Sequence, residues 1–538
     1  MFHRVRSTTG GLLLVVVLLG IPGVLFSQTA LTGGLRGTVA DAQGGPVPEA
    51  VVTLRNQELA IQQETKAGLA GEFSFSGLPS GSSYEVSIEA LGFQPWRRSS
   101  LQVSSGDVSE VAATLELGRM REVITITDTF STLPDYAPEL SKVVDTRQLS
   151  SLPTNGRNLN RFALLNAHVR NASGLGADGF SALRLSINGN SFRDTQFKLD
   201  GNTNYDTLFN NGPLQRLSLS AVQEFKVLTN QFSAEQGETS AGYVLTTTKS
   251  GTDEFHGEVF FYGRPSGSQA RPPLADRHVP NELLQYGGAL GGPIVSGRTF
   301  FFANYERMRQ NRGSFINSPA PAVFTGRLRD NLALVRIDHR INDNHWLALR
   351  VNGHRDTNNN VGDRVGGLVQ PSAGRLSLGQ AVGSQLTDTM TWGRLVNEFR
   401  ASYVNAVPSS SKPLESSVTV IRPGYSTEGD SSFSTVRNET YQLSNQLSFS
   451  TGRHTLKFGG DFVRRKFRDT SFSEFGEYRF GPEAPGHGQN PLQFTQRFGV
   501  AAISYGQTRW AGFLQDDYRV LPRLTLNMGV RYEYQSIT

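Results

Sequence analysis

The stretch Arg523-Leu-Thr-Leu-Asn-Met-Gly-Val-Arg-Tyr-Glu-Tyr534 decides the fold, because its apolar residues recur at every second position. Successive side chains of a strand point to opposite faces, so the stretch predicts a β-strand with one apolar and one polar face. The same alternation recurs over residues 332–338, 347–351, 399–403, 443–449 and 456–462. An exported chain of such strands is typical of an outer-membrane β-barrel, whose strands face lipid on one side and water on the other.

Composition narrows the class of protein. The chain has 538 residues, of which 37% are apolar, and its mean hydropathy is −0.32. A helical membrane protein needs several apolar runs of roughly 20 residues, whereas the only long apolar run is 11–26. Cysteine is absent, which excludes thiol catalysis, disulfides and cysteine-based zinc sites. The net charge of +5 comes without a basic run interleaved with aromatics, so we expect no nucleic-acid partner.

Residues 1–27 resemble a secretory signal peptide. Arg4 and Arg6 supply the positive start, residues 12–25 the apolar centre, and Ser27 a small residue for cleavage. The alternative is a single membrane anchor, against which Gly20, Pro22 and Gly23 interrupt the run.

Four regions follow the leader. Residues 28–118 carry turn signals about every ten residues, which predicts a β-sandwich. Residues 119–131 form a linker, and residues 132–250 form a mixed α/β region whose best helical stretch is 145–168. From residue 251 to 538 the sequence alternates between strand and polar turn.

We count roughly eleven candidate strands after residue 251, whereas a transporter barrel with a plugged lumen has 22. The expectation is therefore the amino-terminal part of a larger antiparallel transmembrane barrel, with a complete small barrel as the alternative. The expected fold class is mainly β: a Greek-key sandwich, a small α/β domain and an incomplete barrel.

Residues 31–117 resemble the carboxypeptidase-regulatory-like domain. The resemblance rests on G-x-V-x-D-x-x-G-x-P-V-P-x-A from Gly37, on Gly71-Glu-Phe-Ser-Phe-Ser-Gly-Leu-Pro-Ser-Gly81, and on Tyr84-Glu-Val-Ser-Ile-Glu-Ala-Leu-Gly-Phe93. That family is a non-catalytic Greek-key sandwich, so the resemblance implies no peptidase activity.

The rest of the chain resembles the TonB-dependent receptors of the Oar-like group. The matching segments are Arg147-Gln-Leu-Ser-Ser-Leu-Pro-Thr-Asn-Gly-Arg-Asn158, Leu199-Asp-Gly-Asn202, Val222-Gln-Glu-Phe-Lys-Val227, Phe232-Ser-Ala-Glu-Gln-Gly237, Thr246-Thr-Thr-Lys-Ser-Gly-Thr-Asp-Glu-Phe-His-Gly257 and Arg298-Thr-Phe-Phe-Phe-Ala-Asn-Tyr-Glu306. The resemblance implies that residues 132–250 form a plug inside the barrel. One departure is Asn166-Ala-His-Val169, where the family pattern has Pro-Gly-Val.

The family also implies a TonB box, a periplasmic segment that pairs as a β-strand with the TonB protein. Strand addition needs an extended, β-prone peptide. The linker segment Glu122, Val123, Ile124, Thr125 and Ile126 fits by composition and position. The alternative is that this segment is simply the last strand of the sandwich.

Other motifs carry little chemistry. Asp200, Asn202, Asn204 and Asp206 alternate oxygen ligands as a calcium loop would, but Tyr205 and Asn211 stand where an EF-hand needs Gly and Glu. Asx turns are the alternative. No zinc-peptidase or serine-hydrolase constellation is visible, so we expect no catalytic residue, metal or cofactor.

The expected function is import across a bacterial outer membrane by a barrel embedded in outer-membrane lipid, with the sandwich and plug on the periplasmic side. TonB and its inner-membrane energising complex are the expected partners, and the substrate is unidentified. The alternatives are an adhesion or surface-structural protein anchored by the same barrel, and a secreted binding protein without a membrane span.

Overall fold

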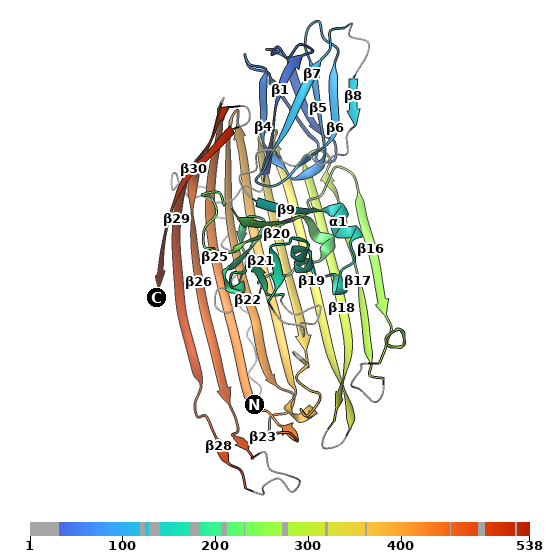
Figure 1. Ribbon diagram of the computed structural model, residues 1–538, viewed down its shortest axis with the longest axis vertical. Coiled ribbons are helices and arrows are strands. Elements are labelled where there is room, and N and C mark those ends of the chain that lie inside the picture. The colour runs from blue at the N-terminus through green and yellow to red at the C-terminus, as the bar shows by residue number, and fades with distance from the viewer. Residues whose placement is uncertain are drawn as a thin grey trace.

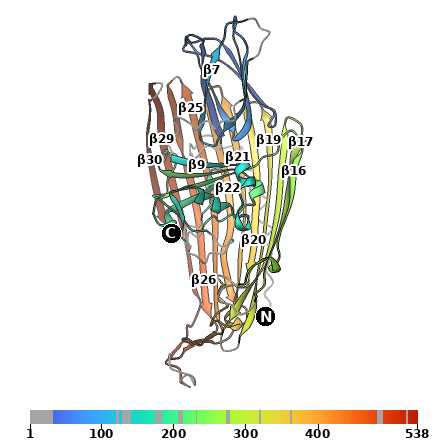
Figure 2. The same ribbon diagram turned by 45° about the vertical axis from the view of Figure 1, so that its right-hand side comes forward.

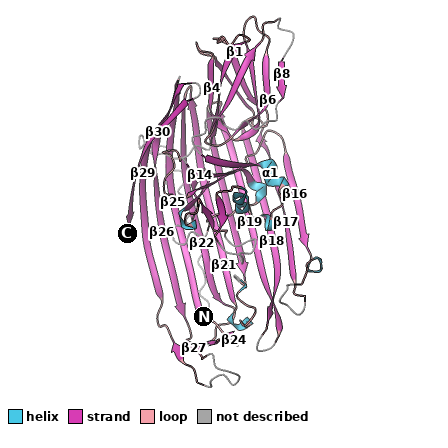
Figure 3. Cartoon of the chain, in the orientation of Figure 1, coloured by secondary structure: helices cyan, strands magenta, loops and turns pink. Residues whose placement is uncertain are grey.

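The computed structural model describes residues 32–118, 124–127, 140–172, 183–205, 212–230, 232–271, 278–317, 321–360, 363–451, 453–481, 490–521 and 524–538. The leader expected over residues 1–27 lies outside this range. The chain forms three bodies. A small sandwich stands at one end of a tall curved sheet, and a smaller mixed body between them in sequence lies against one face of that sheet (Figure 1, Figure 2). Strands dominate all three bodies, and the helices are short (Figure 3).

The first body is a β-sandwich of two sheets, ordered β4-β1-β7 and β3-β2-β5-β6-β8. Its strands are β1 (Thr32–Asp41), β2 (Val51–Asn56), β3 (Ile61–Lys66), β4 (Glu72–Pro79), β5 (Gly81–Glu89), β6 (Trp96–Val103) and β7 (Val108–Leu115). Alternate residues of each strand enter a shared core that includes Leu35, Leu54 and Leu78. The buried Tyr84 hydroxyl donates to the Pro79 carbonyl at 2.7 Å, which satisfies its only donor. The strand pattern predicted from the sequence for this region is therefore confirmed.

Strand β8 (Ile124–Thr127) belongs to the linker and extends the sandwich. It pairs in parallel with β6, with Ile124 opposite Trp96 and Thr127 opposite Ser99. β8 is consequently an edge strand of the second sheet.

The second body is a five-stranded sheet ordered β13-β12-β15-β14-β9, with a separate β10–β11 pair. Its elements are β9 (Leu140–Asp145), α1 (Thr146–Ser151), η1 (Asn155–Arg157), η2 (Leu159–Leu165), β10 (Val169–Asn171), β11 (Leu185–Ile187), η3 (Phe192–Asp194), β12 (Thr195–Leu199), β13 (Asn202–Thr203), η4 (Leu219–Ala221), β14 (Val222–Asn230) and β15 (Gly242–Thr248).

Helix content in this second body is lower than the sequence suggests. The Asp145 carboxylate caps α1 by accepting from the Gln148 amide at 2.8 Å, yet α1 has only six residues. Pro153 follows directly and cannot continue a helix. The stretch Leu159–Leu165 is a 3₁₀ helix rather than an α-helix. Within the described residues, no helix is both long and apolar enough to cross a bilayer.

The third body is one antiparallel sheet of eleven strands among the described residues, ordered β16-β17-β18-β19-β20-β21-β22-β25-β26-β29-β30. These strands are β16 (His256–Arg264), β17 (Asn281–Val295), β18 (Thr299–Ile316), β19 (Ala322–Asn342), β20 (His345–Asn358), β21 (Arg375–Trp392), β22 (Leu395–Pro413), β25 (Ser432–Thr451), β26 (His454–Ser473), β29 (Ala501–Leu521) and β30 (Leu524–Ile537). Short elements lie in the loops at the end away from the sandwich: η5 (Ser266–Ser268), η7 (Pro371–Ala373), β23 (Thr419–Arg422), β24 (Ser426–Glu428), β27 (Glu477–Arg479) and β28 (Gln493–Thr495).

The two faces of the tall sheet differ in polarity, as the alternating sequence predicts. The convex face carries exposed apolar side chains, among them Val335, Leu349, Val382, Leu443 and Leu514. The concave face carries buried polar side chains, among them Glu306, Arg350, Gln385, Arg465 and Arg509. An apolar outer band and a polar interior are the features of a transmembrane barrel wall. We call these the lipid face and the lumen face.

The lipid face predicts the cost of a charge. Leu443 lies on this face of β25, so Leu443→Arg is expected to lower the unfolding free energy in lipid vesicles by about 2–4 kcal/mol. Thr435→Arg, on the same strand and face but eight residues nearer the loops, should cost about 1 kcal/mol or less. A urea titration of vesicle-inserted protein measures both, and equal costs would contradict the assigned membrane position.

Candidate functional site

The second body is seated on the lumen face, and its apolar core includes the wall. Phe302 of β18 and Leu334 of β19 join the buried cluster formed by residues of this body such as Phe162, Phe197 and Phe225. Burial of such side chains contributes about 1.5–3 kcal/mol each. The second body therefore packs as a plug against the barrel wall, and we call it the plug.

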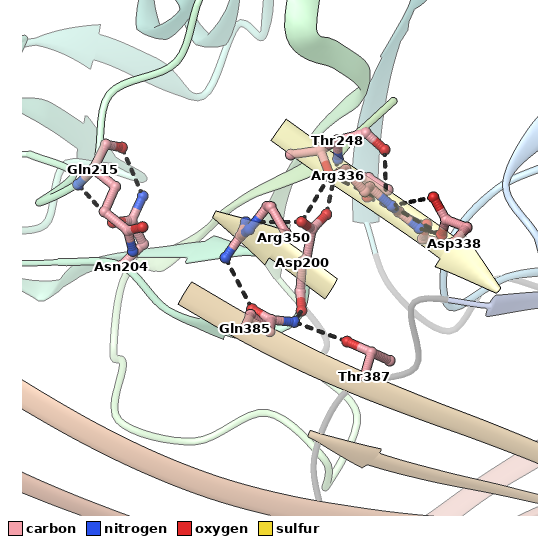
Figure 4. A network of polar contacts seen from close by, with 11 residues as sticks. Asp200, Asn204, Gln215, Thr248, Arg336, Asp338, Arg350, Gln385 and Thr387 are labelled. Carbon is pink, nitrogen blue, oxygen red and sulfur yellow. Dashed lines mark hydrogen bonds and ion pairs between the residues drawn. The ribbon is translucent and has the colours of Figure 1, made fainter. Parts of the chain in front are cut away.

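Asp200 makes the most central polar contact between plug and wall (Figure 4). Its carboxylate accepts from Arg350 of β20 at 2.8 Å and from the Thr248 amide and hydroxyl, each at 2.8 Å. Gln385 of β21 donates to the Asp200 carbonyl at 2.7 Å. Both members of the Asp200–Arg350 ion pair are about 5% exposed, so the pair is shielded from water and salt.

A second ion-pair group joins the plug loop after β14 to β26 and β29. Glu235 receives Lys457 at 3.2 Å, and Glu238 receives Arg509 at 3.0 Å and Arg465 at 3.3 Å. Burial alone would raise the pKa of Glu238, but Arg509 and Arg465 outweigh it and lower that pKa to about 2. Glu238 is therefore ionised at any physiological pH and holds this loop against two cationic side chains of the wall.

The sandwich also contacts the plug. The ammonium of Lys226 on β14 donates to both carboxylate oxygens of Asp107 at 2.8 and 2.9 Å, and the lysine side chain is 3% exposed. Asp107 ends the turn between β6 and β7. Next to this pair, burial raises the pKa of Glu224 to about 7, with Lys226 opposing the shift and Asp107 adding to it.

The sandwich, plug and wall enclose a cavity of about 490 Å³ where they meet. Its lining includes Glu58 and Ser83 of the sandwich, Thr247 of the plug, and Asp338 and Trp346 of the wall. Arg340 of β19 donates to the Ala60 carbonyl at 2.7 Å beside it, so the sandwich is fixed to the rim of the wall as well.

The structure places the expected TonB-box residues only in part. Glu122 and Val123 lie outside the described residues, whereas Ile124, Thr125 and Ile126 lie in β8 and pair with Trp96, Arg97 and Arg98. The segment is extended and sits at a sheet edge. Its role as a TonB box stays a prediction, and the pairing agrees equally with the alternative of a last sandwich strand.

The suggested calcium ligands do not converge. Asp200 is held by Arg350 and Thr248, and Asn204 exchanges hydrogen bonds with the Gln215 backbone at 3.0 and 2.8 Å. Asn202 accepts from Ser444 at 3.5 Å, and Asp206 lies outside the described residues. Within the described part of the chain, no group of three or more His, Cys, Asp or Glu side chains could hold a metal ion.

The sequence interpretation did not single out the ion-pair residues of the lumen face. Arg350, Arg465 and Arg509 are buried on the lumen face. Their neighbours two residues away are of mixed polarity, since Asn352 is polar whereas Val463 is apolar. A charged residue on the polar face of a barrel strand, matched by an acid in the plug, is the signal that could have identified them.

The fold and the seated plug define a plugged outer-membrane barrel, and comparisons with known proteins agree. Residues 247–329 and 323–538 match the outer membrane beta barrel domain family, and residues 34–116 match the carboxypeptidase regulatory-like domain. Over 99% of its length the chain is 23% identical to the TonB-dependent transporter Oar of Myxococcus xanthus, of which it covers 60%.

Solved structures agree in fold. The outer membrane transporter YddB from Escherichia coli superposes with a TM-score of 0.56 at 12% identity, covering 73% of this chain and 56% of that one. The ferric citrate transporter FecA gives a TM-score of 0.54 at 13% identity, covering 74% and 57%. This chain thus spans less than two thirds of the length of these relatives.

The chain belongs to the outer membrane beta barrel domain family, and it is similar to the TonB-dependent transporter Oar. The expected fold class, the family and the location in a bacterial outer membrane are thereby confirmed. Oar, YddB and FecA are all described as transporters.

The Asp200–Arg350 pair should be costly to break. Asp200→Asn leaves the Arg350 guanidinium buried without a counter-charge, so the unfolding free energy of the chain is expected to fall by about 3–5 kcal/mol. The control is Asp343→Asn, which breaks an ion pair with Arg340 whose aspartate is 79% exposed and should cost under about 1 kcal/mol. Denaturant titration measures both free energies of unfolding, and equal costs would contradict the role of the buried Asp200–Arg350 pair in holding the plug.

Glu224 should make stability depend on pH. The pKa of Glu224 in the folded chain, about 7, lies above its ordinary value of 4.5, so the folded chain binds the proton more tightly than the unfolded chain. The contribution of this proton to the free energy of unfolding is therefore full below pH 4.5 and is lost as pH rises towards 7. Glu224→Gln should therefore raise stability at pH 8, on the order of 2–3 kcal/mol, and leave it little changed at pH 4. Melting curves at both pH values measure this, and a gain that is the same at both would contradict the assignment.

Proposed function

We propose that this chain forms the sandwich, the plug and part of the barrel of a TonB-dependent transporter that imports a substrate from outside the cell. The observation that carries the proposal is a plug tied to the lumen face by buried ion pairs, of which Asp200–Arg350 is the most central. Such a plug closes the lumen until work is done on it. TonB, energised by the inner-membrane proton-motive force, supplies that work.

The candidate TonB box in β8 is connected to the plug through the sandwich, so a force applied to β8 would be transmitted to the plug. β8 is held by four residue pairs to β6, and β6 runs into the turn whose Asp107 binds Lys226 of the plug. A net contribution of about 0.5–1.5 kcal/mol for each hydrogen bond makes release of β8 a matter of a few kcal/mol. TonB replaces β6 as the pairing partner of β8 by strand addition.

We also propose the functional division of the chain. Residues 28–118 form a periplasmic docking module, residues 119–131 the TonB-binding linker, residues 132–250 the plug and residues 251–538 the barrel portion. The loops around 356–374 and 407–438 lie at the end of the wall opposite the sandwich, where a substrate arrives, and their chemistry identifies no particular substrate.

The proposal predicts that TonB binding depends on the box. The full chain in detergent is titrated with the carboxy-terminal domain of the TonB from the same bacterium. Ile124→Pro removes a backbone donor from β8 and is expected to weaken binding at least about tenfold, whereas Ile124→Val keeps the donor and should bind like the original chain. Binding unaffected by Ile124→Pro would place the box elsewhere, and no binding by the original chain would favour the adhesion function.

A further inference from the structure

Strands β18, β19 and β20 are neighbours in the wall (Figure 1), and five arginines lie on their lipid face. They are Arg307, Arg309, Arg327, Arg329 and Arg355. Three of them stand next to a lumen-facing acid: Glu306, beside Arg307, contacts Ser218 of the plug, and Asp330 and Asp356, beside Arg329 and Arg355, bind Arg216 of the plug. Because side chains alternate across a strand, the five arginines point away from the plug. We call them the outer arginine cluster.

The register brings like charges together. Arg309 stands directly opposite Arg329, and Arg327 is opposite Asn311 on the same pair of strands. Arg355 is opposite Asn331, which in turn is opposite Arg307. The charges of Arg309, Arg327 and Arg307 all repel Arg329, and Glu282 provides a smaller opposing attraction. Like charges directly opposite on a sheet are destabilising, so the arrangement costs stability as it stands.

Glu282 attracts Arg329, but among the described residues no carboxylate forms an ion pair with the cluster. Arg329 instead donates to the Gln310 and Leu328 carbonyls at 3.1 and 2.8 Å and to Asn311 at 3.0 Å. Arg309, Arg327 and Arg355 are exposed. The guanidinium groups are thus open to an external anion.

The position of the outer arginine cluster along the membrane normal indicates which anion can reach it. Arg309 lies ten residues along β18 from Thr299, which follows the short turn at the sandwich end. At a rise of about 3.4 Å per residue and a tilt of about 40°, that distance corresponds to about 25 Å along the membrane normal, which equals the height of the apolar band of such barrels. Tyr305, which is 45% exposed, lies just below the cluster, and exposed Val335 and Leu349 lie further down. Aromatic residues mark the membrane interface in these proteins.

We propose that the outer arginine cluster binds the phosphorylated headgroup of an outer-leaflet lipid, with the acyl chains of that lipid on the apolar wall beneath. Guanidinium groups bind phosphate through paired, charge-assisted hydrogen bonds. Several arginines on neighbouring strand positions fit a headgroup that carries more than one phosphate. A free anion would use the guanidinium groups alone, whereas a lipid also uses the apolar surface below them.

The test titrates the full chain in uncharged detergent with bis-phosphorylated lipid A, a lipid that carries two phosphates on its headgroup. The variant Arg309→Gln/Arg327→Gln/Arg329→Gln is expected to bind this lipid at least about tenfold more weakly. The control Arg298→Gln/Arg394→Gln/Arg453→Gln removes the same charge from turns at the sandwich end and should bind within about twofold of the original chain. The single variant Arg309→Gln, which keeps four of the five charges, should lose about threefold and guards against a folding failure of the triple variant.

Two further probes separate the lipid from a free anion. The same lipid without its phosphates should bind at least about tenfold more weakly, and inorganic phosphate at millimolar concentration should not displace the lipid. Triple and single variants that both bind like the original chain would overturn the proposal. So would equal binding of the dephosphorylated lipid, or full displacement by inorganic phosphate.

Discussion

Backbone hydrogen bonding in the membrane is the constraint on which the rest of this structure depends. Inside the bilayer every peptide group needs a protein partner, and neighbouring strands provide it through the continuous ladder from β16 to β30. The eleven described strands form a curved sheet with the lumen on its concave side (Figure 1). The plug fills that space, and the polar lumen face is the surface that it meets.

The contact between plug and wall combines two kinds of energy. Apolar packing of Phe302 and Leu334 into the plug core is indifferent to charge. The ion pairs Asp200–Arg350 and Glu238–Arg509 behave differently. Removing one partner costs much stability, because the other charge stays buried without a counter-charge. The intact pair, however, stabilises the contact little more than apolar residues of similar size would. Such a latch suits a plug that must remain seated at rest and yield to a directed force. The Asp107–Lys226 pair extends the same logic to the sandwich.

Much of the architecture was predictable because it depends on local pattern. The period-2 alternation in segments such as 443–449 identified wall strands and assigned their faces, and the turn spacing of residues 28–118 identified the sandwich. Within the helical stretch expected over 145–168, residues 159–165 form a 3₁₀ helix, since a short segment packed on a wall takes its geometry from its contacts. The wall partners of Asp200 and Glu238 could not be predicted, because Arg350 and Arg509 lie more than a hundred residues away and their pairing depends on where the plug sits. The docking of β8 on β6 depends in the same way on an edge that only the folded sandwich presents.

The central claim is that the plug closes the lumen and leaves its seat only when TonB is energised. The chain has no cysteine, so a single Asn202→Cys places one thiol in the buried contact between plug and wall without background. The measurement is the labelling rate of that thiol by a membrane-impermeant reagent in living cells, with and without a protonophore. The account predicts labelling in energised cells that the protonophore, or deletion of TonB, suppresses. Equal labelling in all three conditions would contradict it.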